Sequence, residues 1–137
     1  MPKKIFVNLP VKDLGKTEEF FRKLGFGFDA QFTNEKAACL IIEEGSIYAM
    51  LLAESFFKTF TKKDICDAKR YTEVLLAVEV ETREKVDGMV KKAVNAGGSV
   101  YKEPMDYGWM YGHSFADLDG HQWEVFCMDE SAVPQKQ

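Results

Sequence analysis

Cysteine is scarce in this chain of 137 residues, and its three cysteines form no Cys-x-x-Cys pair. An odd, unpaired set of this kind is typical of reduced thiols in an intracellular protein. Cys39 and Cys127 lie in apolar, strand-like segments, which predicts buried structural thiols. Cys66 lies in a charged segment and is expected to be exposed. No His or Lys stands directly beside Cys39 or Cys127, so a nucleophilic role is not indicated for either.

Long apolar runs and an excess of positive charge are also missing. No run approaches the roughly 20 residues needed to span a bilayer, and residues 1–4 lead into a short strand-like segment rather than a signal core. We therefore expect a cytoplasmic protein without a membrane partner. The net charge of −4 argues against binding to nucleic acid. What is present, 46% hydrophobic and 29% charged residues, is the composition of a globular domain.

The first half of the chain shows two periods of hydrophobicity in succession. Every second residue is apolar over 4–11, which predicts a strand. Asp13 then suits the N-cap of a helix over 14–24, whose apolar residues recur at helical spacing up to a stop at Gly25. Three further strands are predicted at 26–32, 36–43 and 46–53, the last two joined by a hairpin turn.

The second half repeats this order after a segment without a steady period. A strand is predicted at 72–80, and a helix follows that is capped by Thr82 and ends at Gly97. Further strands are predicted at 98–102, 108–117 and 121–128. Strand, helix and three strands thus occur twice, which indicates an internal duplication. The resulting boundaries are modules at 1–54 and 71–130, a linker at 55–70 and a tail at 131–137.

Two segments resemble motifs of the vicinal oxygen chelate superfamily, which includes glyoxalases, bleomycin-resistance proteins and extradiol dioxygenases. VNLPVKDLGKTEEFFRKLGF is similar to the first strand and the V-x-D-L helix of that family. FADLDGHQWEVF is similar to its terminal D-P-D-G hairpin, with Leu118 in place of the usual proline. The resemblance implies one α+β domain in which two tandem βαβββ modules form an open barrel around a cavity. It also implies a small-molecule ligand, often a divalent metal, and a two-fold homodimer.

The family's metal site is incomplete in this chain. Metalloenzymes of the family place ligands on four strands, and the chemistry needs at least three side chains such as His, Glu, Gln or Tyr. In chain order the resemblance carries these positions onto Phe6, Ala49 or Met50, Glu73 or Leu75, and Glu124. Phe6 has no donor atom, and a Met thioether suits a hard divalent ion poorly. One clear carboxylate, Glu124, remains, and we therefore predict no bound cofactor.

A divalent metal stays open as an alternative. Glu124, Glu73 and His113 could hold one if a bulge turned His113 into the cavity. The protein would then be a metal-dependent lyase, thiol transferase or dioxygenase. Glu124 is the best candidate for a catalytic acid or base, although no catalytic residue is assigned. His121 is interpreted as a turn residue bound to the backbone.

Aromatic side chains are expected to line the cavity, where a few polar groups would orient a ligand. The predicted set is Phe6, Asn8, Phe56, Phe57, Trp109, Tyr111, Ser114 and Glu124. The alternative for several of the aromatic residues is a core or dimer contact. Trp123, which alternates away from Glu124, is expected in the core. The sequence thus favours a metal-independent protein that binds a small, partly aromatic or cationic molecule.

Overall fold

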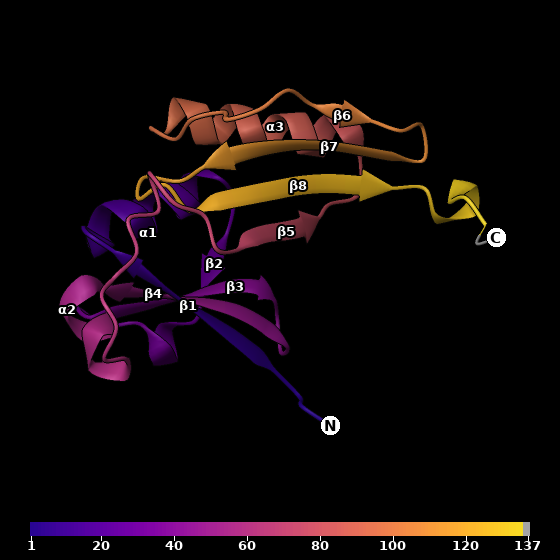
Figure 1. Ribbon diagram of the computed structural model, residues 1–137. Helices are drawn as coiled ribbons and strands as arrows, with labels where there is room; N and C mark the ends of the chain where they lie inside the picture. The colour runs from indigo at the N-terminus through magenta and orange to yellow at the C-terminus, as the bar shows by residue number, and fades with distance from the viewer. Residues whose placement is uncertain (136–137) are drawn as a thin grey trace. The chain divides into compact units, whose positions relative to one another are not determined.

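The computed structural model describes residues 1–135, and the chain divides into two compact units between Asp67 and Ala68 (Figure 1). Each unit contains a strand, a helix and three further strands, and its four strands form one open sheet. The predicted α+β fold of two tandem βαβββ modules is therefore confirmed. Residues 136–137 of the predicted tail lie outside the described part. Along residues 1–135, no helix has the length and apolar character that crossing a membrane requires.

The first unit is built on a sheet with the strand order β1-β4-β3-β2. Its elements are β1 (Ile5–Val11), α1 (Leu14–Lys23), β2 (Gly27–Phe28), β3 (Ala37–Glu43) and β4 (Ile47–Ala53). β1 runs parallel to β4, whereas β3 runs antiparallel to both of its neighbours. A short helix, α2 (Glu54–Phe57), and a 3-10 turn at Lys58–Phe60 follow in the predicted linker.

Local sequence accounts for where α1 begins and which face it buries. Asp13 has an extended backbone, and its carboxylate accepts a hydrogen bond from the backbone N–H of Lys16 at 3.1 Å. Such an N-cap satisfies a donor that the helix itself cannot, and it contributes about 1 kcal/mol. Thr17, Phe20 and Phe21 are buried on the side where α1 contacts β3 and β4. The predicted helical spacing of apolar residues is therefore the spacing of this buried face.

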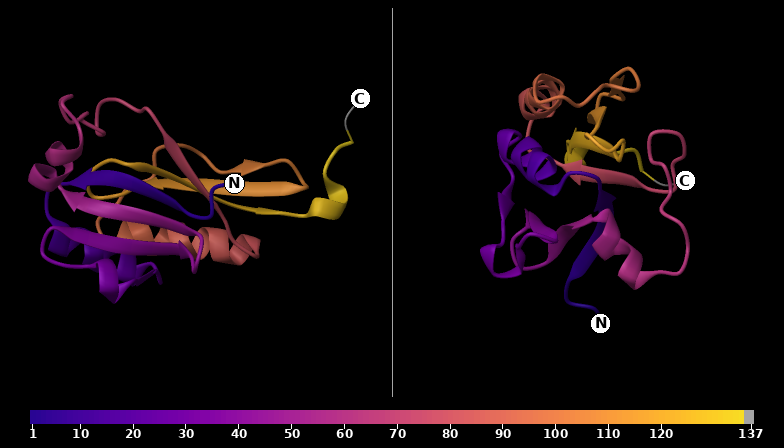
Figure 2. Two further views of the ribbon diagram at one scale, coloured as in Figure 1. Left: turned by 90° about the horizontal axis from the view of Figure 1, so that it is seen from below. Right: turned by 90° about the vertical axis from the view of Figure 1, so that its left-hand side faces the viewer.

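The second unit repeats the arrangement, with the strand order β5-β8-β7-β6. Its elements are β5 (Leu75–Glu79), α3 (Arg83–Asn95), β6 (Met105–Asp106), β7 (Met110–Ala116) and β8 (Gln122–Met128). β5 runs parallel to β8, and β7 runs antiparallel to β8. Thr82 caps α3 as predicted, and the buried residues of the helix are Val86, Val90 and Ala93. The helix lies along β7 and β8 (Figure 2).

The strand predicted at 26–32 is wrong over most of its length. Only Gly27–Phe28 forms a strand, and a 3-10 turn follows at once. The cause is Asp29, whose carboxylate accepts a hydrogen bond from the backbone N–H of Gln31 at 3.0 Å. A short polar side chain that bonds to nearby backbone competes with strand pairing.

Two strands of the second unit also differ from the prediction. Residues 98–102 form only an isolated bridge between Ser99 and Ala116, because the chain leaves β7 after this one pair. The strand predicted at 72–80 begins at Leu75. The two-residue strand β6 was not predicted, since two residues are too few to show alternation.

Predictions for single side chains are confirmed more often. Cys39 and Cys127 are buried and Cys66 is exposed. Trp123 is 0% exposed and stacks on Phe115, with ring centres 6.2 Å apart and planes 4° from parallel. The core of the second unit therefore has an aromatic pair at its centre, between the sheet and α3.

Candidate ligand-binding site

Strand register assigns the side chains of the second sheet to its two faces. Glu124 of β8 lies directly opposite Ala77 of β5 and Ser114 of β7. Side chains paired directly across strands point to the same face, and successive side chains point to opposite faces. The predicted site residues Glu124 and Ser114 therefore share one face. Trp123 and Val125, both fully buried, belong to the face on which α3 packs.

Both oxygens of the Glu124 carboxylate have partners from the segment that precedes β6. The Tyr101 hydroxyl donates to Oε2, and the Lys102 ammonium donates to Oε1 at 2.8 Å. The Glu124 side chain is 19% exposed and that of Lys102 is 38% exposed. A carboxylate that has lost most of its water needs such donors, because an unpaired buried charge is costly. The ion pair leaves this end of the site without net charge.

Tyr101 acts in this cluster as a hydrogen-bond donor and not as an anion. Burial raises the pKa of its hydroxyl, and the hydrogen bond to Glu124 and the charge of Glu124 raise it further, against a smaller opposing effect of Ser114. Tyr101 is therefore protonated at neutral pH. A donor that cannot change its protonation state holds Glu124 in one orientation, which a selective binding site requires.

A hollow of about 300 Å³ lies beside Glu124 on the same sheet. Its lining combines the Glu124–Lys102 pair with Gly112 and with apolar side chains, chiefly Leu75, Ala77, Met105, Met110 and Phe126. Gly112 lies opposite Phe126 in the register, and because it has no side chain it leaves room next to that ring. Apolar walls with a few polar groups at one end are typical of sites for small molecules.

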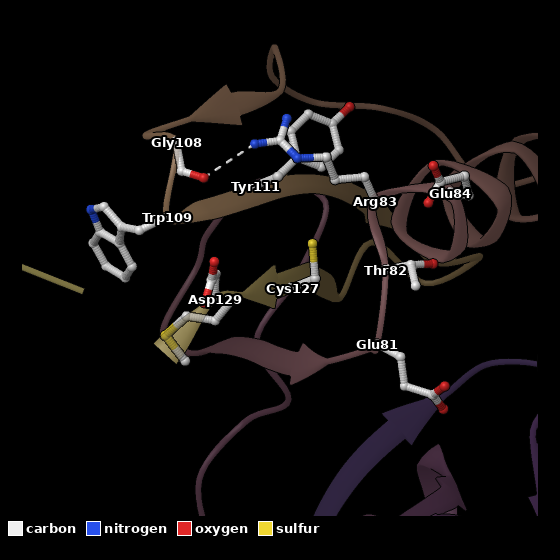
Figure 3. A pocket seen from close by; sticks show the side chains of 10 residues that line it. Glu81, Thr82, Arg83, Glu84, Gly108, Trp109, Tyr111, Cys127 and Asp129 are labelled. Atoms are coloured by element: carbon white, nitrogen blue, oxygen red, sulfur yellow. Dashed lines mark hydrogen bonds between the residues drawn. The ribbon is translucent and has the colours of Figure 1, made fainter. Parts of the chain in front are cut away.

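Trp109 and Tyr111 line a different hollow, of about 290 Å³, at the N-terminal end of α3 (Figure 3). Tyr111 lies opposite Cys127 in the register, and Cys127 is three residues after Glu124 on β8. Alternation therefore turns Tyr111 to the helix side of the sheet. The expectation that Trp109 and Tyr111 share a wall with Glu124 is corrected accordingly. A ligand role for them in their own hollow stays a prediction.

Arg83 and Tyr111, which line this second hollow, already have hydrogen-bond partners within the protein. Arg83 donates to both carboxylate oxygens of Asp106, at 2.7 and 2.9 Å, and to the backbone oxygen of Gly108 at 3.4 Å. The Arg83 hydrogen bond lowers the pKa of Asp106 to about 2. The Tyr111 hydroxyl donates to Asp87 at 2.6 Å, which raises the pKa of Tyr111 to about 12. These contacts attach the β6–β7 turn to α3. They explain the positions of Arg83 and Tyr111 without a ligand.

His113 also borders the hollow beside Glu124, but alternation along β7 turns its side chain to the helix face of the sheet. β7 pairs with β8 without interruption from Met110 to Ala116, and His113 lies opposite Val125. The bulge that would turn His113 toward Glu124 is therefore absent, and the alternative ligand set with Glu73 is not assembled. Among residues 1–135, no three His, Cys, Asp or Glu side chains gather as a metal group would require. Whether the protein binds a metal stays a prediction.

The remaining predicted site residues belong to the first unit. Phe6 is 44% exposed and stacks on Tyr48, with ring centres 4.9 Å apart. Asn8 is exposed and lies on the same strand face as Phe6. Phe56 and Phe57 are half-buried in α2. Their part in binding a ligand stays a prediction.

Sequence reasoning missed the two residues that hold Glu124. Tyr101 and Lys102 lie 23 and 22 residues before it in the chain. They stand in a segment that forms no regular strand, so neither periodicity nor a short motif marks them. The one available signal was the adjacent phenol and ammonium in the sequence VYKE, which is too common to identify a site.

Each unit has a four-stranded sheet, and the last strand of the second unit carries the half-buried Glu124. Comparison with known proteins identifies the family that has this architecture. The family model described as Glyoxalase/Bleomycin resistance protein/Dioxygenase superfamily matches residues 5–125. The chain therefore belongs to this superfamily, as the motifs predicted. No match is found among curated protein sequences.

Solved structures agree with this membership. A hypothetical protein from S. aureus is 30% identical, with a TM-score of 0.78 and coverage of 93% of this chain and 95% of that one. A glyoxalase-related enzyme from Fulvimarina pelagi is 18% identical, with a TM-score of 0.77 and coverage of 93% and 88%. A family enzyme from Burkholderia phytofirmans is 19% identical, with a TM-score of 0.72 and coverage of 90% and 96%. The last two likenesses show the fold alone.

Proposed function

We propose that this protein binds a small, largely apolar molecule in the hollow beside Glu124, and that it does so without a metal ion. The observation that carries the proposal is the Glu124 carboxylate, held by Tyr101 and Lys102 at one end of an apolar hollow of about 300 Å³. The apolar walls supply binding free energy, about 25 cal/mol for each Å² of apolar surface removed from water. The polar end supplies orientation.

The side chains at the family's metal positions support metal independence. Phe6 has no donor atom, and the thioether of Met50 is a poor ligand for a hard cation. Ala77 is the residue of β5 that pairs with Glu124, Leu75 pairs with Gln122, and Glu73 lies before the strand begins. Glu124 itself already accepts hydrogen bonds at both oxygens. This donor set does not fit a divalent metal, and no reaction step is assigned to one.

Methionine methyl groups provide a direct test of binding in the hollow. Met105 and Met110 line it, whereas Met50 and Met89 do not. In protein labelled at the methionine methyl carbons, neutral aromatic fragments that carry an N–H or O–H donor are expected to shift the NMR signals of Met105 and Met110 alone. Glu124→Gln should weaken this binding about tenfold, the effect of one charge-assisted hydrogen bond.

The matched control for this substitution is Glu43→Gln, the same chemical change at an exposed strand end of the first unit. It should leave the fragment affinity unchanged. Equal shifts at all four methyl groups, or unchanged affinity in Glu124→Gln, would show that the fragments do not use this site.

Divalent metals are expected to leave the thermal stability unchanged. A cation present at 100 times its Kd would stabilise the fold by about 2.7 kcal/mol, which raises Tm by several degrees. We expect melting curves of the untagged protein in EDTA, Zn²⁺, Ni²⁺, Mn²⁺ and Fe²⁺ to agree within about 1 °C. Near-stoichiometric metal in elemental analysis, or a clear rise with one ion, would contradict metal independence.

A further inference from the structure

We infer that the ligand of this hollow has an uncharged polar end that pairs with Glu124 and Lys102 together, as a carboxamide or a lactam does. The inference rests on the proposed function and names the ligand class. The sequence favours a partly aromatic or cationic ligand, and the inference departs from the cationic alternative because of Lys102, which sequence reasoning did not place at the site.

The Glu124–Lys102 ion pair removes the advantage of a charged ligand. A ligand ammonium would have to share the Glu124 carboxylate with the Lys102 ammonium, which already lies 2.8 Å from Oε1, and the two positive charges would repel each other. Its own dehydration beside apolar walls would remain as a cost. A ligand carboxylate would meet the negative charge of Glu124 at the same place. Charge of either sign therefore adds little to affinity here.

The same pair offers a donor and an acceptor side by side. One of the three N–H donors of Lys102 goes to Glu124, and two remain for a ligand. Each oxygen of Glu124 accepts one hydrogen bond from Lys102 or Tyr101 and has a second lone pair. An amide presents a C=O and an N–H on neighbouring atoms, so it can accept from Lys102 and donate to Glu124 at once. The rest of the molecule would contact Met105, Met110 and other apolar walls.

Three probes that differ only in their polar end test the inference. 3-Phenylpropanamide, 3-phenylpropylamine and 3-phenylpropanoate share one aromatic skeleton and carry a neutral, a positive and a negative group. The readout is titration of the Met105 and Met110 methyl signals in the intact protein. The amide is expected to bind at least about tenfold more tightly than either charged probe.

Two substitutions should then remove the preference for the neutral probe. Lys102→Met keeps the length of the side chain but leaves Glu124 without its counter-charge, so the ammonium probe should bind about tenfold more tightly than it does to the wild type. Glu124→Gln leaves Lys102 unpaired, so the carboxylate probe should gain by a similar factor. Lys91→Met, at an exposed position of α3, is the matched control and should change nothing.

The outcomes separate this inference from the proposed function. If the wild type binds a charged probe as tightly as the amide, the inference is overturned while binding in the hollow stands. If none of the three probes moves the Met105 and Met110 signals, the inference is also overturned. The proposed function falls with it only if the neutral fragments likewise leave both signals in place.

Discussion

Replacing Asp117 with alanine is expected to lower the free energy of unfolding of the second unit by about 3 to 5 kcal/mol. The Asp117 carboxylate is 5% exposed and accepts three hydrogen bonds. Two come from the backbone N–H groups of Asp119 and His121, both at 3.0 Å, and the third from the Trp123 indole at 3.1 Å. Because Trp123 is fully buried, water cannot replace this acceptor, and the substitution leaves a desolvated donor in the core.

Urea unfolding followed by tryptophan fluorescence measures the effect, since both tryptophans of the chain, Trp109 and Trp123, belong to the second unit. Asp64→Ala is the matched control, because the Asp64 side chain is fully exposed, and it should change stability by less than about 0.5 kcal/mol. Asp117→Asn keeps an oxygen for the two backbone donors but places the amide NH2 group, itself a donor, against the indole N–H. An intermediate loss of unfolding free energy is therefore expected. An unchanged urea midpoint for Asp117→Ala would show that the three hydrogen bonds contribute nothing net.

The parts of the fold that were predicted from the sequence are those with long, regular patterns. Asp13 and Thr82 each cap a helix whose buried residues recur at helical spacing over one or two turns, so one local rule supports another. The errors lie where a short segment depends on a single competing contact. Asp29 ends β2 by bonding to backbone two residues ahead, and residues 98–102 lie opposite β7 at one position only. The hydrophobic pattern of the sequence does not indicate the early end of β2 or the single pairing of residues 98–102.

Among the predicted site residues, Glu124 was identified from a motif, whereas the positions of others depend on strand phase and on contacts between distant parts of the chain. Glu124 is part of the terminal hairpin pattern and does line a hollow. Tyr111 was placed on the correct strand but on the wrong face, because the register of β7 with β8 sets the phase and a shift of one residue reverses every side chain. Lys102 reaches Glu124 across 22 residues of chain, a contact that only the tertiary fold creates.

Gly120→Ala is expected to destabilise the second unit by about 3 kcal/mol, for two reasons that add. Gly120 ends the turn between β7 and β8 with φ of +92°, a conformation that costs a residue with a side chain about 1 to 2 kcal/mol. A Cβ atom there would also lie 2.7 Å from Cγ and 2.8 Å from the backbone nitrogen of Lys69. The Lys69 side chain can move away from the added carbon, but its backbone nitrogen can do so only if residues 68–69, the first of the second unit, shift as well.

Gly108→Ala isolates the first of these reasons. Gly108 has φ of +82° and nothing within 4 Å of the added carbon, so it should lose only the conformational cost of about 1 to 2 kcal/mol. The difference between the two variants, measured by urea unfolding, is therefore the contribution of close packing between the turn and residues 68–69. Equal losses of unfolding free energy would mean that residues 68–69 move away from the added carbon at no measurable cost. A larger loss at Gly120 would show that the D-x-D-G turn is needed for packing. In this turn Asp117 accepts a hydrogen bond from the buried Trp123, and Gly120 leaves room for Ala68 and Lys69. These two residues lead to β5, which pairs with the strand that carries Glu124.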